Sequence, residues 1–255
     1  MFAALHRPEV NELLAGLSLG EKRKRRAVLS VLFETAMDAG KIHANEAKVK
    51  LKTPERRQRI IDPTILAKMM RAAASHPYAL TIQTAYAMLL FTVQRPTDCL
   101  NALRANRHDG GIRIFQQKTG KWVWVPEHAL LSAALDRAAH IQSDYLVCYP
   151  DGRPVPWWQL NRWSNEIKKA AGVADIQDRD FRRTGIVMMA EAGAQVPMIA
   201  ALSGHTKAEV NHIIETYLPA TPRLAKAAIA AWEADVKSAE SLKFRPEQML
   251  EHTDI

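Results

Sequence analysis

The sequence predicts a mainly α-helical protein with one small β-hairpin, divided into two unequal parts by a basic segment. Most of its 255 residues lie in segments whose apolar side chains recur every three to four positions, as on one face of an α-helix. In residues 110–126, Ile112 and Ile114 alternate with polar neighbours instead, and an aromatic and β-branched run at 122–125 follows a tight turn, which is the pattern of paired β-strands. With 47% hydrophobic and 24% charged residues, the chain has the composition of a globular protein rather than a disordered one.

The charge and the cysteines narrow the range of partners and compartments. A formal net charge of +8 favours a polyanionic partner, with nucleic acid as the first candidate. Cys99 and Cys148 lie in apolar surroundings without metal-ligand spacing, so we expect two reduced core thiols in a cytoplasmic protein. The first residues lack the pattern of a secretory signal, and the longest apolar run, residues 85–93, is too short to cross a bilayer. No membrane partner is therefore expected.

The N-terminal part, residues 1–48, is expected to contain an amphipathic helix over residues 22–38 that ends before Gly40. Its first turn is basic, and these side chains either face water or contact DNA phosphates. The apolar residues with helical spacing are Val28, Val31, Leu32 and Ala36.

Residues 46–60 have little apolar periodicity and many lysines and arginines, so we expect an extended basic linker, assigned to residues 49–61. A larger domain is then expected over residues 62–240, followed by a tail at 241–255. It opens with Asp62 as N-cap and Pro63 in the first helical position.

Within the larger domain, the first helices are expected at residues 63–75 and 79–94. In "GGIRIFQQKTGKWVWVP", Ile112 and Ile114 alternate with polar neighbours, and "TG" forms a tight turn before a second strand. After Pro126 the chain is expected to be helical, apart from a short apolar stretch at 145–149.

The last predicted helix begins with Thr221 as N-cap and Pro222 in the first helical position. Its apolar stripe packs either on its own domain or on a neighbouring copy of the chain. The stripe consists of Ala225, Ala228, Ile229 and Trp232.

Two basic side chains are expected at structurally defined positions. Proline disfavours helix at the residue before it, so Pro96 places Arg95 at a helix break. Asp98, three residues later, can hold the Arg95 guanidinium through an ion pair. Lys118 lies at the end of the first hairpin strand, beside the tight turn.

The segment "RDFRRTG", residues 179–185, gathers three arginines directly before an apolar helical stretch. The N-terminus of a helix is already positive, so these arginines either point into water or await an anion. 

Farther along, His205 falls in the connection between a helix that ends at Gly204 and one that begins at Thr206. Thr206 and Glu209 have the spacing of a capping box. Tyr217 ends the helix that follows.

In order and spacing, these motifs resemble those of the tyrosine recombinase, or phage integrase, family. The resemblance covers residues 62–232 and rests on five short motifs, each weak alone and specific in this order: "QRPTDCLNAL", "QQKTGKWVWVP", "RDFRRTG", "LSGH" and "ETYL". It implies the DNA breaking-rejoining fold of the family's catalytic domain at residues 62–240. Residues 21–45 look like the last part of the family's core-binding domain, so residues 1–48 are expected to be a partial helical core-binding domain.

The resemblance implies a site-specific recombinase of a phage or mobile element. Such an enzyme cleaves and rejoins double-stranded DNA at core sites through a 3′-phosphotyrosyl intermediate, without metal, ATP or other cofactor. It implies a homotetramer on DNA and a cytoplasmic protein that is associated with the nucleoid when bound. The implied catalytic residues are Tyr217 as nucleophile, Arg95 and Arg182 on the scissile phosphate, Lys118 as general acid, His205 as hydrogen-bond donor, and Arg179. Further DNA contacts are expected from Arg23, Lys24, Arg25, Arg26, Arg56, Arg57, Arg59 and Arg183.

The sequence departs from the family pattern at two places. Position 179 is arginine where the family usually has histidine, and Tyr217 follows His205 by twelve residues, more than is common. A guanidinium keeps its proton at ordinary pH, so Arg179 cannot be a general base. We expect it to favour the phenolate as a cation, with His212 or water accepting the proton. Asp98 and Asp180 are expected to support the arginines.

Three other interpretations remain open at this point. A catalytically inactive, recombinase-derived DNA-binding protein or truncated prophage remnant would fit Arg179 and the short N-terminal part. A helix-turn-helix regulator would use residues 197–203 and 207–216, but explains neither Lys118 nor the arginines. A type IB topoisomerase would share the chemistry without strand exchange.

Overall fold

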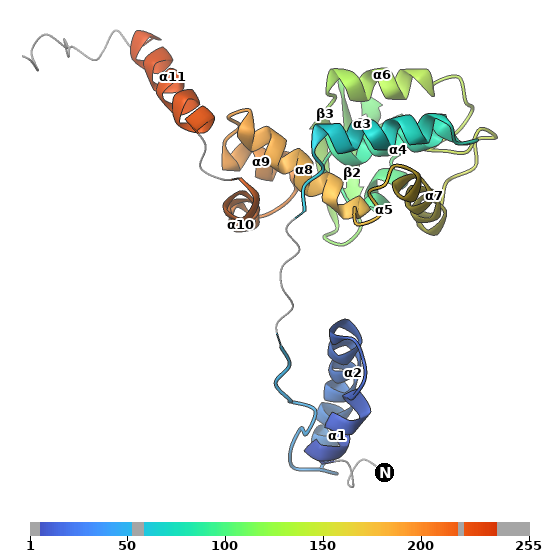
Figure 1. Cartoon of the computed structure of the whole chain (residues 1–255), viewed down its shortest axis with the longest axis vertical. Helices are drawn as coiled ribbons and strands as arrows, with labels where there is room; N and C mark the ends of the chain where they lie inside the picture. Colours follow the sequence, from blue (N-terminus) through green and yellow to red (C-terminus); the bar gives the residue numbers. More distant parts are fainter. Residues whose placement is uncertain (1–5, 53–58, 219–221, 239–255) are drawn as a thin grey trace, which may run out of the picture. The chain divides into compact units, whose positions relative to one another are not determined.

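The computed structural model describes residues 6–52, 59–218 and 222–238. The chain divides into two compact units, Met1–Arg57 and Gln58–Ile255 (Figure 1). As predicted, the protein is mainly helical with one small antiparallel sheet. In the part of the chain that the structure describes, no helix has the length and apolar character needed to span a membrane.

The smaller unit contains two helices, α1 (Arg7–Leu14) and α2 (Leu19–Asp38). The predicted helix at 22–38 is confirmed, and it starts three residues earlier because Ser18 and Glu21 form a capping box. α1 was not foreseen. The core of this unit consists of Val10, Leu14, Phe33, Ala47 and Val49.

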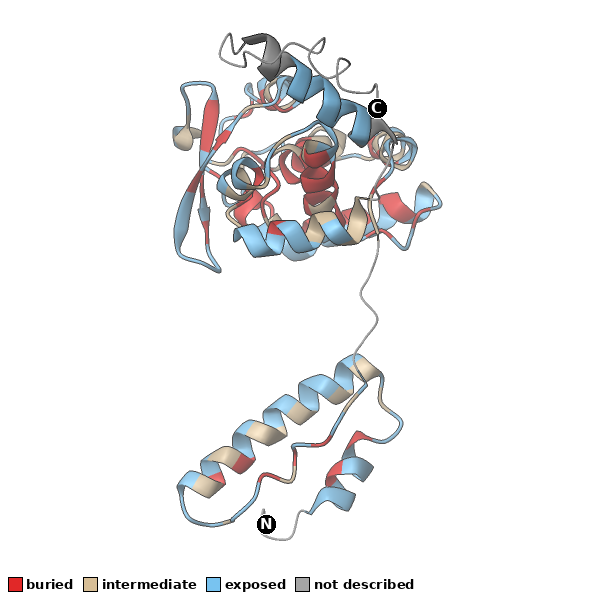
Figure 2. Cartoon of the chain, turned by 90° about the vertical axis from the view of Figure 1, so that its left-hand side faces the viewer, coloured by how far each residue is buried: buried red, intermediate tan, exposed pale blue. Residues whose placement is uncertain are grey.

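The predicted apolar face of α2 is wrong at three of its four positions. Ala36 is buried, but Val28, Val31 and Leu32 are 62%, 65% and 42% exposed. Phe33 is the large buried residue instead, because within the described residues of this unit α2 packs against α1 and the chain that follows α2 (Figure 2). Helical spacing identifies apolar positions, but which of them are covered depends on the elements available to cover them.

The N-terminal end of the predicted linker, residues 46–60, is packed rather than extended. Ala47 and Val49 are buried against Phe33. The Asn45 side-chain amide donates to Ser30 O at 3.1 Å and to Glu34 Oε1 at 2.7 Å, which fixes the chain on α2.

The larger unit is built around α4 (Ala79–Phe91), which is buried along nearly all of its length. α4 contacts α3, α6, α7 and α8 (Figure 1). The predicted start at Asp62 and Pro63 is confirmed, since Asp62 Oδ1 accepts the Thr64 N–H at 2.8 Å. The helices around α4 are α3 (Pro63–Ala74), α5 (Pro96–Leu100), α6 (Ala129–Arg137), α7 (Trp157–Ala170) and α8 (Asp178–Glu191).

The predicted hairpin is confirmed as β2 (Gly111–Gln116) and β3 (Lys121–Pro126). A short strand that was not predicted, β1 (Arg107–His108), pairs with β2, so the antiparallel order is β1-β2-β3. The opposed pairs Ile112–Val125 and Ile114–Val123 face the core. The alternate pairs face outward, and Figure 2 shows the resulting alternation of buried and exposed residues along the strands.

The C-terminal half of the larger unit carries α8 (Asp178–Glu191), α9 (Val196–Ser203) and α10 (Lys207–Tyr217). α8 crosses the end of α4 at Gly185, where a Cβ would lie 2.4 Å from Val93 Cγ1 and 2.5 Å from Leu90 O. Only glycine allows this close approach, which places residue 185 of α8 directly against Val93 in the helix break that precedes α5.

α11 (Pro222–Ser238) begins with the predicted proline, whereas Thr221 and the predicted tail lie outside the described residues. The described side chains of α11, residues 225–233, are all exposed, including Ile229 at 52% and Trp232 at 66%. Of the two alternatives for its apolar stripe, packing on its own domain is therefore not seen for these side chains.

Candidate active site

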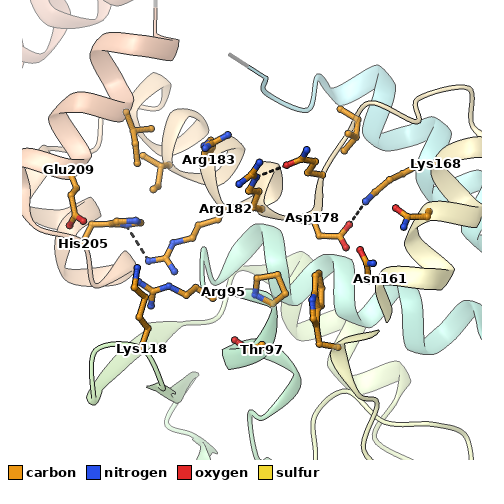
Figure 3. Close-up of a pocket in the computed structure, with 18 of the residues that line it drawn as sticks. Arg95, Thr97, Lys118, Asn161, Lys168, Asp178, Arg182, Arg183, His205 and Glu209 are labelled. Carbon is orange, nitrogen blue, oxygen red and sulfur yellow. Dashed lines mark hydrogen bonds and ion pairs between the residues drawn. The ribbon is translucent and has the colours of Figure 1, made fainter. Parts of the chain in front are cut away.

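One cavity of about 1030 Å³ opens between the hairpin turn, α5, α7, α8 and α10. Five of the six side chains that the sequence predicts to be catalytic line it, together with Arg183, and they come from segments far apart in the chain (Figure 3). These are Arg95, Lys118, Arg179, Arg182, Arg183 and His205.

Arg182 is the most buried of these cations, at 8% exposure. Its Nη2 donates to Ser203 O at 2.7 Å and lies 3.3 Å from His205 Nδ1. Its Nε and Nη1 are buried and make no hydrogen bond with any described residue. Burial, and then the charge of Arg95, lower the pKa of Arg182 to about 10. The group is a desolvated cation with free donors, which is an unfavourable state that a bound anion would relieve.

Arg95 is the N-cap of α5, at the helix break predicted from Pro96. Its Nη1 lies 3.6 Å from Asp98 Oδ2, the ion pair that the sequence suggested. The same nitrogen is buried and forms no hydrogen bond within the described residues. Asp98 Oδ1 also accepts the backbone N–H of Gln117 at 3.1 Å, so one buried carboxylate positions both Arg95 and the hairpin turn.

His205 is a neutral hydrogen-bond donor at neutral pH. Burial, and then the charge of Arg182, lower its pKa to about 4. Arg182 can only donate, so its contact makes Nδ1 of His205 the acceptor. The tautomer that fits this contact carries the ring proton on Nε2, from which it can be donated to an anion in the cavity.

The lowered pKa of His205 predicts a pH-dependent stability. Below its ordinary pKa of 6.5 the unfolded chain takes up a proton that the folded protein does not bind until about pH 4. The contribution of His205 is therefore fully present above pH 6.5 and is lost as the pH falls toward 4. We expect urea unfolding midpoints at pH 7.5 and 5.0 to differ more in the parent than in His205→Asn. Equal differences in the two proteins would contradict the assignment.

A buried network of amides, not foreseen from the sequence, joins the segments that carry the cations. Gln116 Nε2 donates to Gln94 Oε1 at 2.6 Å and to Ser203 O at 3.0 Å. Gln94 Nε2 donates in turn to Leu202 O at 2.9 Å. These two glutamines are fully buried, next to Arg95 and beside the turn of Lys118. In the sequence, the only sign of this network is a glutamine within each of two apolar segments, at 94 and 116. That sign does not show that the two glutamines bond to each other.

The backbone of Gly204 packs directly against the side chain of Gln116, so a substitution there tests the network. Gly204 has φ of +69°, and a Cβ there would lie 2.2 Å from Gln116 Nε2. Gly204→Ala is therefore expected to strain the backbone and displace Gln116, lowering stability by about 1–3 kcal/mol. Gly193→Ala is the matched control, since Gly193 also has positive φ but no atom within 4 Å of its Cβ position. Thermal melts that show equal losses for both would place the cost in the backbone alone.

Among the predicted catalytic residues, Tyr217 is the one that the structure does not bring into the cavity. It is the last residue of α10 and is not among the residues that line the cavity. The Cζ atom of Arg183 lies 5.8 Å from the centroid of its ring, a cation–π contact. Arg183 also contacts Asp180 Oδ1 at 3.3 Å, so Asp180 supports this arginine. His212, on the same helix as Tyr217, does line the cavity.

Arg179 lies at the mouth of the cavity, exposed in the first turn of α8. Its Nε donates to the Gln177 side chain. The next residue back, Asp178, forms a buried ion pair with Lys168 of α7. This pair was not foreseen. It anchors the N-terminus of α8, and with it the arginines of the first two turns.

The remaining cations of the sequence prediction are spread over both units. Arg23, Lys24 and Arg25 are exposed on α2, while Arg26 Nη1 donates to Val49 O at 3.2 Å. Arg59 pairs with Asp175 at 2.9 Å in the larger unit. Arg56 and Arg57 lie outside the described residues.

No family model matches the chain, and no curated protein sequence matches it either. Solved structures, in contrast, do match the chain. A lambda integrase dimer bound to a COC′ core site matches with a TM-score of 0.72 at 19% identity, over 82% of this chain and 80% of that one. The Tn1549 transposon integrase in complex with circular intermediate DNA matches with a TM-score of 0.68 at 14% identity, over 89% and 85%.

A lambda integrase tetramer bound to a Holliday junction also matches, with a TM-score of 0.70 at 20% identity. That match covers 80% of this chain and 65% of the other, so this chain spans about two thirds of its length. These neighbours are tyrosine recombinases, and the chain has the fold of that family, as its motifs implied.

Proposed function

We propose that this chain is a tyrosine-type site-specific DNA recombinase, which cleaves and rejoins double-stranded DNA through a 3′-phosphotyrosyl intermediate. The observation that carries the proposal is the pair of guanidinium groups of Arg95 and Arg182 at one cavity. Three of their nitrogens are buried without a hydrogen bond to any residue that the structure describes. Two neighbouring cations with free donors fit a single oxyanion that has several oxygens.

The scissile phosphodiester of DNA would be that anion. Attack on phosphorus places additional negative charge on the non-bridging oxygens, and fixed guanidinium donors stabilise it most in the transition state. His205 would donate from Nε2 to the same group. Because the donors are fixed by Asp98 and Ser203 before DNA arrives, little reorganisation is needed during the reaction.

Tyr217 would be the nucleophile. A bond forms between its phenolic oxygen and phosphorus, and the bond from phosphorus to the 5′ oxygen breaks. Lys118, at the hairpin turn, would protonate that oxygen as general acid. Arg183, whose Cζ atom lies 5.8 Å from the ring centroid of Tyr217, and Arg179 would supply positive charge near the attacking oxygen, and His212 or water would accept its proton. The proposal requires the end of α10 to bring Tyr217 to the phosphate when DNA binds.

The proposed chemistry needs neither metal nor ATP. The arginines supply the charge stabilisation, and the covalent link conserves the energy of the phosphodiester for rejoining. Reversal of the same steps with the 5′ hydroxyl of another strand completes strand exchange.

We extend the proposal to the rest of the chain. Residues 1–48 would act as a partial core-binding domain, with Arg23, Lys24 and Arg25 facing phosphates, and residues 62–240 as the catalytic domain. Duplex core sites of a phage or mobile element would be the substrate. Four copies would assemble around two duplexes, as in the lambda integrase tetramer on a Holliday junction. The DNA-bound protein would then be associated with the nucleoid.

The experiment uses a nicked suicide duplex that carries the core site, taken from the ends of the flanking element. We expect a covalent protein–DNA adduct on a denaturing gel with the parent and none with Tyr217→Phe. An adduct that persists in Tyr217→Phe would exclude this nucleophile. Binding in a shift assay without any adduct from the parent would favour the alternative of an inactive DNA-binding protein.

A further inference from the structure

The outward face of the hairpin carries a row of exposed aromatic side chains that the site described above does not use. Phe115, Trp122 and Trp124 are 42%, 53% and 41% exposed. The strand register places all three on the face opposite the core, with Phe115 opposed to Trp122 and Arg113 opposed to Trp124. Large exposed aromatic residues gathered on one face are uncommon in a protein that has no partner there.

The rings on this face are held by neighbouring groups. Trp124 lies over Gly111, where a Cβ would be 2.4 Å from its ring, so glycine makes the room for it. The ring of His108 lies 5.4 Å from that of Trp124. Trp122 packs between Phe115, at 5.3 Å between ring centroids, and the guanidinium of Arg113, whose Cζ is 5.3 Å from its ring. Rings ordered in this way lose little further entropy when a planar ligand stacks on them.

The charge on this face favours a polyanion. The positively charged Arg113 lies in the middle of the row. None of the residues that face outward on β2 and β3 is acidic. At the end of the row where the His108 ring lies beside Trp124, the carboxylate of Asp109 contacts His108 Nδ1 at 2.9 Å. Aromatic rings beside an arginine are the features by which proteins bind unpaired bases and their phosphates.

The row ends one residue pair before the turn that carries Lys118, a residue that lines the candidate active site. The opposed pair Phe115–Trp122 is followed by Gln116–Lys121, which closes the turn that carries Lys118. A strand whose phosphate sits beside Lys118 can therefore continue onto this face. Duplex DNA keeps its bases stacked inside, so only an unpaired strand can use the rings.

We propose that the outward face of β2 and β3 is a stacking surface for single-stranded DNA. Its ligand would be the strand end that cleavage releases and that must unpair before it joins another duplex. The origin of that strand, DNA cleavage by this protein, rests on the proposed function. The proposal that the hairpin face binds single-stranded DNA does not.

The test measures binding of the full-length chain to a fluorescein-labelled oligothymidylate and to a blunt duplex of equal length, by fluorescence anisotropy. Stacking on aromatic side chains contributes about 1–3 kcal/mol per base, so Trp122→Ala should weaken single-strand binding about 5- to 150-fold. Trp122→Tyr, which keeps a ring, should restore most of it. Trp158→Ala is the matched control, since Trp158 is 64% exposed on α7 and lies on neither the row nor the cavity.

Arg113→Gln keeps all the aromatic rings, so it tests the inference even if Trp122→Ala fails to fold. It should weaken single-strand binding severalfold and reduce its salt dependence. Parent-like affinity of both variants would overturn the inference. So would a change from dimer to monomer on Trp122→Ala in sedimentation, because the face would then be an interface between copies. Loss of the Tyr217-dependent adduct with intact single-strand binding would count against the proposed function alone.

Discussion

Replacing Arg182 with glutamine is expected to slow first-strand cleavage by about a hundred- to a thousandfold, the typical effect of removing one fixed donor to a developing oxyanion. Arg182 presents two buried nitrogens without hydrogen bonds among the described residues, and glutamine supplies neither their charge nor their planar pair of donors. The rate is measured as adduct formation on the nicked duplex at saturating protein, so that weaker DNA binding does not contribute.

Stability separates a catalytic role from a structural one for Arg182. Burial and Arg95 lower the pKa of Arg182, which means that its charge is unfavourable in the folded protein. The melting temperature of Arg182→Gln should therefore stay the same or rise while cleavage falls. Arg107→Gln is the comparison. Arg107 does not line the cavity, and its Nε lies 2.7 Å from Glu127 Oε1, so loss of this ion pair should lower stability. A large drop in the melting temperature of Arg182→Gln would reassign it to a structural role.

Lys118→Met is expected to slow cleavage of ordinary DNA by about a hundred- to ten-thousandfold, because the 5′ oxygen would leave without a proton. A substrate with sulfur in place of that bridging oxygen should restore the rate, since a thiolate is a good leaving group without protonation. The measurement is the ratio of adduct rates on the two substrates.

The control for Lys118 is its neighbour on the same hairpin. Lys121 is exposed and does not line the cavity, so Lys121→Met should leave the ratio at the parental value. If Lys118→Met is equally slow on both substrates, the lysine does not act as the general acid and instead helps to bind the phosphate.

Features that depend on neighbouring residues could be predicted from the sequence. The start of α3 at Asp62 and Pro63 and the capping box of Thr206 and Glu209 were both confirmed. So was the hairpin that carries Lys118. Each rests on hydrogen bonds and backbone preferences within a few residues. The cavity cations were found because their motifs occur in the family order, and the structure places Arg95, Lys118, Arg182 and His205 around one cavity.

Features that depend on distant segments could not be predicted. The face of α2 was wrong at Val28, Val31 and Leu32, because its partners are α1 and residues 47 and 49. The sequence likewise could not predict three other features. These are the hydrogen bond of Gln116 to Gln94, the ion pair of Lys168 with Asp178, and the position of Tyr217 outside the cavity.

The sequence by itself determined the starts of α3 and α10, the hairpin, and the arginines that line the cavity, because short-range hydrogen bonding and motif order suffice for these. Only the tertiary structure decided which apolar faces are covered and which polar groups are desolvated. Burial depends on segments that meet after a long loop of chain has closed. It is burial that lowers the pKa values of Arg182 and His205, and so makes the cavity ready for an anion.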